Sequence, residues 1–231
     1  MSGPLIVAID GPAGVGKSTA ARLLAERLGV PYLDTGAMYR AIALAVLDTG
    51  ADPDDREAVL EIAAAADVSL RGAADGRFAV LLDGEPVEAR IRAPRVGEAA
   101  SKVSVHPEVR ERMVALQRAC ARRFGAVLEG RDIGTKVFPR TPYKFFVTAS
   151  PEVRVDRRHR QLRDLGREVE RGEIEREVEE RDARDAGREA SPLTRDDSYV
   201  EVDTSEIGIE EVVDRMERAV RQAPTPGRRS P

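Results

Sequence analysis

Residues 5–28 read LIVAIDGPAGVGKSTAARLLAERL and contain three features in a fixed order. Five apolar residues at 5–9 predict a short strand that is buried on both faces. Residues 11–18 then fit the pattern G-x-x-x-x-G-K-[ST] at every fixed position, and apolar residues recur at helical spacing from Ser18 onward. A strand, a glycine-rich loop and a helix in this order form the setting in which such a loop binds phosphate. The stretch therefore predicts a nucleoside triphosphate site.

The chemistry of this loop follows from its residue types. Glycines allow consecutive backbone N–H groups to point inward without Cβ clashes, and the start of the helix adds the positive end of its dipole. Lys17 is expected to reach the β- and γ-phosphates, and the Ser18 hydroxyl is expected to hold Mg²⁺. Lysine is scarce here, with 4 lysines against 33 arginines, so composition alone does not account for Lys17.

The composition narrows the class of protein. With 231 residues, 42% of them hydrophobic, the chain can form one α/β domain or a core with a small insert. The net charge of −4 argues against a general affinity for nucleic acid or anionic membranes. The longest apolar run, residues 41–47, is too short to cross a bilayer, and the first residues do not resemble a signal peptide. We expect a cytoplasmic protein.

The cysteine and the histidines are not expected to act chemically. Cys120 is the only cysteine, which excludes a disulfide framework and favours a reducing compartment. It falls in helical register with Val109 and Met113, so we expect a core residue rather than a nucleophile. His106 and His159 are 53 positions apart in unrelated settings, and a zinc site is not expected.

Strands and helices alternate along most of the chain. Short β-like runs lie at 32–33, 126–129, 143–148 and 198–202, with helical patterns between them. This alternation after a phosphate-binding loop predicts a parallel sheet covered by helices on both faces, with the ligand at the carboxyl ends of the strands. Residues 67–92 differ, because two short β-like runs are joined by glycine-rich turns. We expect a small antiparallel insert there.

Residues 151–188 carry charge of both signs, with 11 arginines and 12 acidic residues. One interpretation is a solvated helical pair crossed by salt bridges. The other is a mobile cover over bound phosphates, in which Arg154, Arg157 and Arg158 lie on adjoining faces of one helix. We favour the cover, because a triphosphate site needs neutralising charge.

The phosphate-binding loop alone leaves three classes open: a phosphotransferase, a GTP-driven switch and an ATP-driven motor. The chain contains no asparagine, so the guanine-reading Asn-Lys-x-Asp signature is absent and a switch is disfavoured. A motor usually belongs to a larger machine. A phosphotransferase must hold a second anion near the γ-phosphate. Arg40, in the helix after Thr35, and Arg131, directly after a core strand, are candidates for that role.

Several longer stretches carry a more specific resemblance. They are IDGPAGVGKSTAA, YLDTGAMYRAIAL, AASKV, EGRDIGTKVFP and ERDARD. Together they resemble bacterial cytidylate kinases, over residues 5–220. The resemblance implies transfer of the γ-phosphate of ATP to CMP or dCMP, giving ADP and CDP or dCDP, with Mg²⁺. It also implies a P-loop NTPase-type fold of five parallel strands, with a nucleoside monophosphate insert and an arginine-rich helical lid.

The resemblance assigns roles to individual residues. Those implied to bind the phosphates of ATP are Gly11, Pro12, Ala13, Gly14, Val15, Gly16, Lys17, Ser18 and Thr19, with Arg154 and Arg157 from the lid. Those implied to bind the acceptor are Thr35, Arg40, Arg131 and Arg181 near its phosphate, Ser101, Arg110 and Asp132 near the cytosine, and Asp185 and Arg188 near the sugar. Lys17, Arg131, Arg158 and Arg181 are implied to act in catalysis, and Ser18 to bind the metal.

One kinase domain is expected. Its predicted parts are a core at 1–66, 93–150 and 189–221, the insert at about 67–92, the lid at about 151–188 and a disordered tail at 222–231. The expected partners are small-molecule substrates, without nucleic acid or membrane, and the protein is expected to be a monomer. Two alternatives stay open: another small P-loop kinase, for AMP, UMP or an alcohol such as shikimate, and an ATP- or GTP-binding regulatory module without transfer activity.

Overall fold

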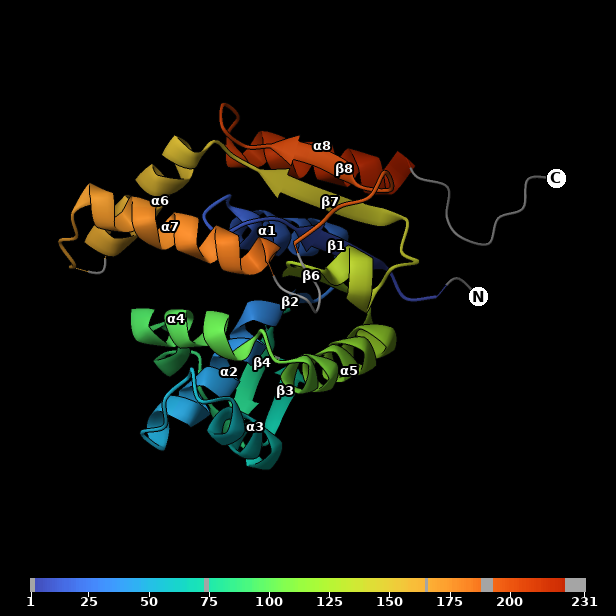
Figure 1. The fold of residues 1–231 in the computed structure, drawn as a ribbon. Helices are drawn as coiled ribbons and strands as arrows, with labels where there is room; N and C mark the ends of the chain where they lie inside the picture. Colours follow the sequence, from blue (N-terminus) through green and yellow to red (C-terminus); the bar gives the residue numbers. More distant parts are fainter. Residues whose placement is uncertain (1–2, 73–74, 165, 188–192, 223–231) are drawn as a thin grey trace.

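The computed structural model describes residues 3–72, 75–164, 166–187 and 193–222. Its centre is a five-stranded, fully parallel sheet in the order β2–β6–β1–β7–β8 (Figure 1). The strands are β1 (Ile6–Asp10), β2 (Tyr32–Asp34), β6 (Ala126–Gly130), β7 (Tyr143–Thr148) and β8 (Val200–Asp203). The predicted parallel sheet is confirmed, with the strand that precedes the phosphate-binding loop at its centre.

Both faces of the sheet are buried, and alternate residues of β1 show how. Val7 and Ile9 pack into a cluster with α1 (Lys17–Leu28) and α8 (Ile209–Gln222), whereas Ala8 packs into the cluster formed with α2 (Thr35–Asp48). Successive side chains of a strand point to opposite faces, so a strand covered on both sides is apolar throughout. This double burial explains why residues 5–9 lack any hydrophobic alternation.

The helices between α2 and β6, together with a second sheet, pack around α2. The elements are α3 (Arg56–Ala65), β3 (Val68–Gly72), β4 (Phe78–Leu82), β5 (Glu85–Pro86), the short helix η1 (Arg90–Arg92), α4 (Pro94–Val103) and α5 (Pro107–Phe124). Strands β3, β4 and β5 pair antiparallel in that order, which confirms the predicted antiparallel insert. Pro94 and Pro107 begin their helices, where the missing N–H would have had no partner.

Residues 151–186 form a helical pair that projects from the end of β7 (Figure 1). It consists of α6 (Pro151–Asp164) and α7 (Arg171–Ala186). Its apolar core is small: Val155, Leu162, Ile174 and Val178 form a cluster separate from the two clusters on the sheet. The helical pair is thus an autonomous projection joined to the core mainly by polar contacts, as a lid requires.

Cys120 was expected in the core, but it is only half-buried, because the last turn of α5 is near solvent and the adjacent Phe124 is 51% exposed. Burial nevertheless raises the pKa of the Cys120 thiol to about 11. Within the described residues, no helix has the length and apolar content to cross a membrane. The disordered tail was predicted at 222–231, but Gln222 is the last residue of α8; residues 223–231 lie outside the described residues.

Candidate active site

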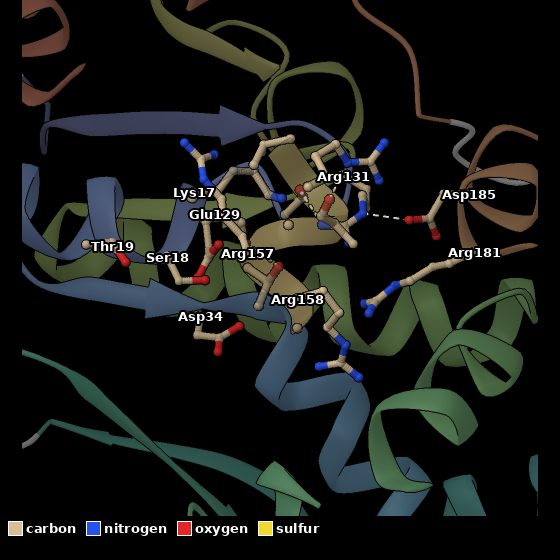
Figure 2. Close-up of a pocket in the computed structure, with 18 of the residues that line it drawn as sticks. Lys17, Ser18, Thr19, Asp34, Glu129, Arg131, Arg157, Arg158, Arg181 and Asp185 are labelled. Carbon is tan, nitrogen blue, oxygen red and sulfur yellow. Dashed lines mark hydrogen bonds and ion pairs between the residues drawn. The ribbon is translucent and has the colours of Figure 1, made fainter. Parts of the chain in front are cut away.

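A cavity of about 600 Å³ opens at the carboxyl ends of the parallel strands (Figure 2). The phosphate-binding loop forms one wall, because residues 13–19 line it. The start of α2, the turn after β6, the start of α6 and the end of α7 supply the other walls. Parallel strands place all their carboxyl ends at one edge, so residues far apart in sequence meet there.

The phosphate-binding loop is built on glycines that other residues could not replace. Gly11 has a φ of 147°, and a Cβ there would overlap the Val147 carbonyl of the neighbouring strand. Gly16 has a φ of 91° and precedes the first residue of α1. The Lys17 ammonium donates to the Pro12 carbonyl at 2.6 Å, inside the loop it belongs to. Burial, followed by the charge of Arg131, lowers the pKa of Lys17.

Two carboxylates that the sequence interpretation missed lie opposite Lys17, beside Ser18. Glu129, on β6, accepts from the Tyr32 hydroxyl and interacts with the Ser18 hydroxyl. Asp34, the last residue of β2, caps α2 by accepting from the Ala37 N–H at 3.0 Å. Burial, and then the charge of Asp34, raises the pKa of Glu129. Their positions at the ends of core strands were the available signal.

Arg131 and Arg181 line the cavity beside Asp185 (Figure 2). Arg131 Nε donates to Asp185 Oδ2 at 2.7 Å, and Asp185 is 1% exposed. Burial acts to lower the pKa of Arg131, but the Asp185 carboxylate, together with Glu129 and Asp10, raises it above the ordinary value. Arg181 carries a buried Nε without a hydrogen-bond partner among the described residues, and burial lowers its pKa to about 10. Arg40 is 3.7 Å from Asp34.

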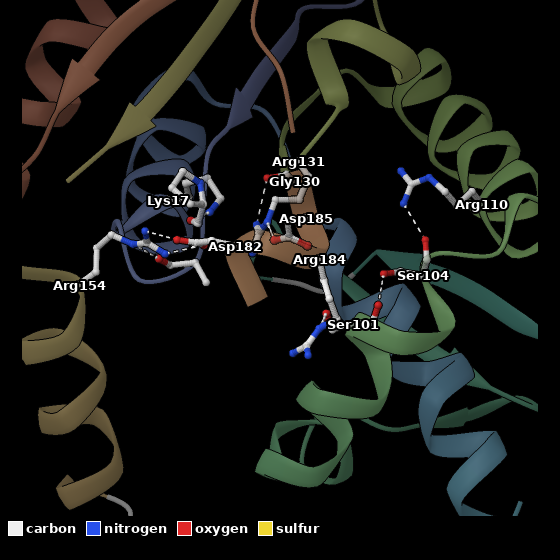
Figure 3. Close-up of polar contacts among 12 residues, drawn as sticks. Lys17, Ser101, Ser104, Arg110, Gly130, Arg131, Arg154, Asp182, Arg184 and Asp185 are labelled. Atoms are coloured by element: carbon white, nitrogen blue, oxygen red, sulfur yellow. Dashed lines mark hydrogen bonds and ion pairs between the residues drawn. The ribbon is translucent and has the colours of Figure 1, made fainter. Parts of the chain in front are cut away.

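A polar group from α4 and α5 closes the end of the cavity (Figure 3). Arg110, buried in α5, donates through Nη2 to Asp132 and through Nη1 to the Ser104 carbonyl, the latter at 3.2 Å. Ser101 accepts from Arg184 Nε at 3.2 Å. The Arg110 Nε is buried and has no partner among the described residues. A buried donor without a partner is costly unless a ligand satisfies it.

The three lid arginines reach the cavity, each with a different anchor. Arg154 donates to the Ala13 carbonyl at 2.7 Å and pairs with Asp182 of α7 (Figure 3). Arg157 donates to the side chain and carbonyl of Thr204, just after β8. Arg158 donates to Glu177 of α7 at 2.8 Å. The first two arginines therefore hold the root of the lid against the phosphate loop.

The structure brings all but three of the candidate residues together around one cavity. Most of them line this cavity: Ala13, Gly14, Val15, Gly16, Lys17, Ser18, Thr19, Thr35, Arg40, Ser101, Arg110, Arg131, Asp132, Arg154, Arg157, Arg158, Arg181 and Asp185. Gly11 and Pro12 begin the loop without lining the cavity. Arg188 lies outside the described residues.

The fold and the site define a P-loop kinase, with a phosphate loop and a second cationic site in one cavity. The family described as cytidylate kinase matches residues 7–222. The chain therefore belongs to the cytidylate kinase family.

Individual relatives agree with this assignment. A cytidylate kinase of Caldanaerobacter subterraneus subsp. tengcongensis is 47% identical over 94% of each chain. One from Pelotomaculum thermopropionicum is 48% identical over 90% of this chain and 92% of its own. A solved structure of an uncharacterised Eubacterium ventriosum protein has a TM-score of 0.51 and 12% identity, over 95% of this chain and 99% of that one, and supports the fold alone.

Proposed function

We propose that the protein transfers the γ-phosphate of ATP to CMP or dCMP, giving ADP and CDP or dCDP. The observation that carries the proposal is the shared cavity. The phosphate loop opens at one end, the Ser101, Arg110 and Asp132 group lies at the other, and Arg131 and Arg181 are among the residues that line the space. A kinase for nucleoside monophosphates needs two nucleotide sites whose phosphates meet.

The transfer itself needs little covalent chemistry from the protein. An oxygen of the CMP phosphate attacks the γ-phosphorus in line, the bond from that phosphorus to the β–γ bridging oxygen breaks, and ADP leaves with the electron pair. The attacking oxygen is already ionised, so no strong general base is required. Lys17, Arg131, Arg158 and Arg181 supply the positive charge, and Thr35 and Arg40 orient the acceptor phosphate.

The residues near Ser18 fit Mg²⁺ that arrives with ATP. Mg²⁺ prefers oxygen ligands and usually binds one or two carboxylates together with substrate phosphates. The Ser18 hydroxyl, Asp34 and Glu129 supply such oxygens. Within the described residues, no group of three or more His, Cys, Asp or Glu could hold a metal. The donor set is therefore suited to a metal that the nucleotide brings rather than to a resident one.

Base recognition follows from the hydrogen-bonding pattern of cytosine. Its exocyclic amino group donates, where uracil has an accepting carbonyl. The Asp132 carboxylate can accept from the amino group, and the Arg110 guanidinium, with its unpartnered Nε, can donate to the ring carbonyl. A uracil carbonyl facing Asp132 would leave both acceptors without a donor, so UMP is disfavoured.

The proposal extends to the lid and the setting. Closing of α6 and α7 over the transferred group would exclude water and limit hydrolysis of ATP. Asp185 and Arg188 would bind the sugar hydroxyls. The protein acts as a monomer on small molecules in the cytoplasm, where ATP and Mg²⁺ are available. Sedimentation in the presence and absence of both nucleotides measures the oligomeric state.

The deciding experiment measures ADP release from MgATP with CMP, dCMP, UMP, AMP, GMP or shikimate offered in turn. Lys17→Ala serves as the inactive reference, and Lys136→Ala, at an exposed position on the turn after β6, is the matched control. We expect CMP and dCMP to be preferred. Preference for UMP or AMP would keep the kinase and overturn the base site, and ADP release independent of every acceptor would overturn the proposed transfer.

A further inference from the structure

Asp10 is a fully buried carboxylate to which the proposed reaction gives no role. It is the last residue of β1, directly before the phosphate loop, and it is 0% exposed. It does not line the cavity. A buried charge is expensive unless it is well paired, so its contacts should indicate what it holds.

The Asp10 carboxylate accepts hydrogen bonds from the turn that follows β6. One oxygen accepts from the Ile133 N–H at 2.9 Å and the other from the Gly134 N–H at 2.8 Å. These two residues begin the turn η2 (Ile133–Val137), and they directly follow Arg131 and Asp132. Two bonds to consecutive backbone amides fix both the position and the orientation of a turn. Arg131 and Asp132 are therefore carried by a backbone that Asp10 holds.

Tyr199 adds a third bond from a different part of the chain. Its hydroxyl donates to Asp10 Oδ2 at 2.8 Å, and its ring is in edge contact with Phe146 at 6.0 Å between centroids. The fit to the turn is tight, because a Cβ on Gly134 would lie 2.8 Å from the Tyr199 Cζ. Tyr199 does not line the cavity either.

Tyr199 belongs to the segment 193–199, which directly precedes β8. The Leu193 N–H of this segment donates to the Asp185 carbonyl of α7 at 2.9 Å. Buried Lys144 donates to Ser198 Oγ at 2.9 Å, and its ammonium is 5.6 Å from the centre of the Tyr199 ring. The segment thus touches the end of the lid at one end and Asp10 at the other.

We propose that Asp10 and Tyr199 form a positioning pair, which holds the turn bearing Arg131 and Asp132 in register with the acceptor and ties that turn to the segment leaving the lid. The acceptor's identity as CMP rests on the proposed function. Neither side chain touches substrate. The pair acts through the backbone of residues 131–134, so its loss should affect the acceptor side of the reaction and leave the ATP side largely intact.

Tyr199→Phe tests the functional half, because it removes one hydroxyl and keeps the ring packing. We expect the KM for CMP to rise roughly five- to tenfold with a comparable fall in kcat, as for the loss of one buried hydrogen bond to a charged group, while the KM for ATP changes less than about twofold. The matched control is Tyr143→Phe, because Tyr143 is the first residue of β7, at the opposite edge of the sheet from the cavity. It should match the wild type.

Asp10→Asn tests the acceptor of the pair, because it replaces the carboxylate that accepts the three hydrogen bonds. An amide offers one acceptor oxygen, and its NH₂ group would face one of the three donors, so the turn should be held less firmly than in Tyr199→Phe. We expect a larger rise in the KM for CMP. A rise in the KM for ATP that equals or exceeds it would overturn the proposal, because that pattern would indicate a general disturbance of β1 and the phosphate loop.

Amide hydrogen exchange in the nucleotide-free protein tests the hold without any substrate. The Ile133 and Gly134 amides should exchange at least about tenfold faster in Asp10→Asn than in the wild type, while amides within α8 stay unchanged. Unchanged exchange at both positions would overturn the positioning pair. So would faster exchange with an unaltered KM for CMP. If the wild-type protein phosphorylates no CMP at all, the proposed function fails instead, and the exchange experiment still decides whether Asp10 holds the turn.

Discussion

Charged side chains in this cavity are buried beside charges of the same sign. Burial and the charge of Arg131 lower the pKa values of both Lys17 and Arg181. On the opposite side, burial and the charge of Asp34 raise the pKa of Glu129. Each group is thus held at a cost that an incoming phosphate or metal would relieve. Such arrangements occur where binding, rather than stability, determines the residue.

Arg131 is the charge that acts on both Lys17 and Arg181, so its removal should be visible in kinetics. Arg131→Ala removes a guanidinium that the proposed function places beside the transferred phosphate. We expect kcat to fall by about 10²- to 10³-fold while the KM for ATP changes by less than about threefold. Arg131→Lys should recover part of the rate. The control is Arg215→Ala, on the exposed side of α8. Steady-state kinetics with CMP measure all three, and an unchanged kcat in Arg131→Ala would remove Arg131 from the catalytic group.

Asp10 makes stability depend on pH in a defined range. Burial raises the pKa of Asp10 from an ordinary value near 3.8 to about 6, although the N–H groups of Gly134 and Ile133 act to lower it. Because the folded pKa is the higher one, the native state binds more protons between these values. Stability present below the unfolded pKa is therefore lost as the pH rises through about 6. The fully buried group makes this loss about 3 kcal/mol.

Asp10→Asn does not titrate at this position and should lack that loss. We compare the free energies of unfolding of Asp10→Asn and the wild type at the two ends of this range. The difference between variant and wild type should shift by about 3 kcal/mol in favour of the variant from about pH 4 to pH 7. The other charged or titratable groups around Asp10 are Tyr199, Asp132, Arg131 and Lys144, all kept in the variant. Urea unfolding across this range is the measurement, with exposed Asp164→Asn as the control. A constant difference across the range would contradict the assignment.

At the scale of elements, the turn η2 directly follows Arg131 and Asp132, which line the cavity. Its N-terminal end carries Arg131 and Asp132, and Arg118 of α5 donates to the carbonyls of Lys136 and Val137 at its other end. It includes an i→i+5 bond from the Phe138 N–H to the Ile133 carbonyl, a rare geometry that is frequent at functional sites. The turn is thus held from β1, α5 and the segment before β8 together.

This tight fit predicts the effect of a single methyl group. In Gly134→Ala the new Cβ would overlap the Tyr199 hydroxyl and lie 3.0 Å from Lys144 Cδ. We expect a loss of about 2 kcal/mol in the free energy of unfolding, with a raised KM for CMP. Gly172→Ala is the control, because no atom lies within 4 Å of the position its Cβ would take. It should change stability by less than about 1 kcal/mol in the same urea experiment.

At the scale of the whole molecule, the lid and the insert face each other across an open cleft. A second cavity of about 1560 Å³ adjoins the active site and is lined by α4 and β4 on one side and by α6 and α7 on the other. Both walls carry charges of both signs: Arg95 and Glu98 line the cavity from α4, and Arg176 and Glu180 line it from α7. Ion pairs between the two walls can therefore form when they approach, and closure would remove water from the phosphates.

Closure can be measured as a distance. Dyes attached at Glu61→Cys on α3 and Glu179→Cys on α7, both exposed positions, should approach each other when ATP and CMP bind together. The raised pKa of half-buried Cys120, about 11, keeps its thiol protonated at neutral pH and limits labelling there. Single-molecule energy transfer should rise most with both nucleotides. An efficiency unaffected by nucleotides would show that the lid does not close over the insert.

The phosphate loop, the strands and the class of fold could be predicted because each depends on local pattern. Residues 11–18 match a loop pattern that binds phosphate through backbone N–H groups oriented by its own glycines, so neighbours in sequence are also neighbours in space. The antiparallel insert and the helical pair at 151–186 were likewise readable from apolar runs and turn residues. Amphipathic register misjudged Cys120, because register indicates which face of a helix is apolar but not how far the core extends beneath that face.

Tertiary structure alone decided which charges meet. The sequence has 37 basic and 41 acidic side chains, and no local pattern indicates that Arg131 pairs with Asp185 or Arg110 with Asp132. Asp10 looked like an ordinary strand end until Tyr199, 189 residues away, was found to contact it. These pairings arise where strands, a turn and the lid converge at one sheet edge, and electrostatic contacts depend on separation in space rather than along the chain.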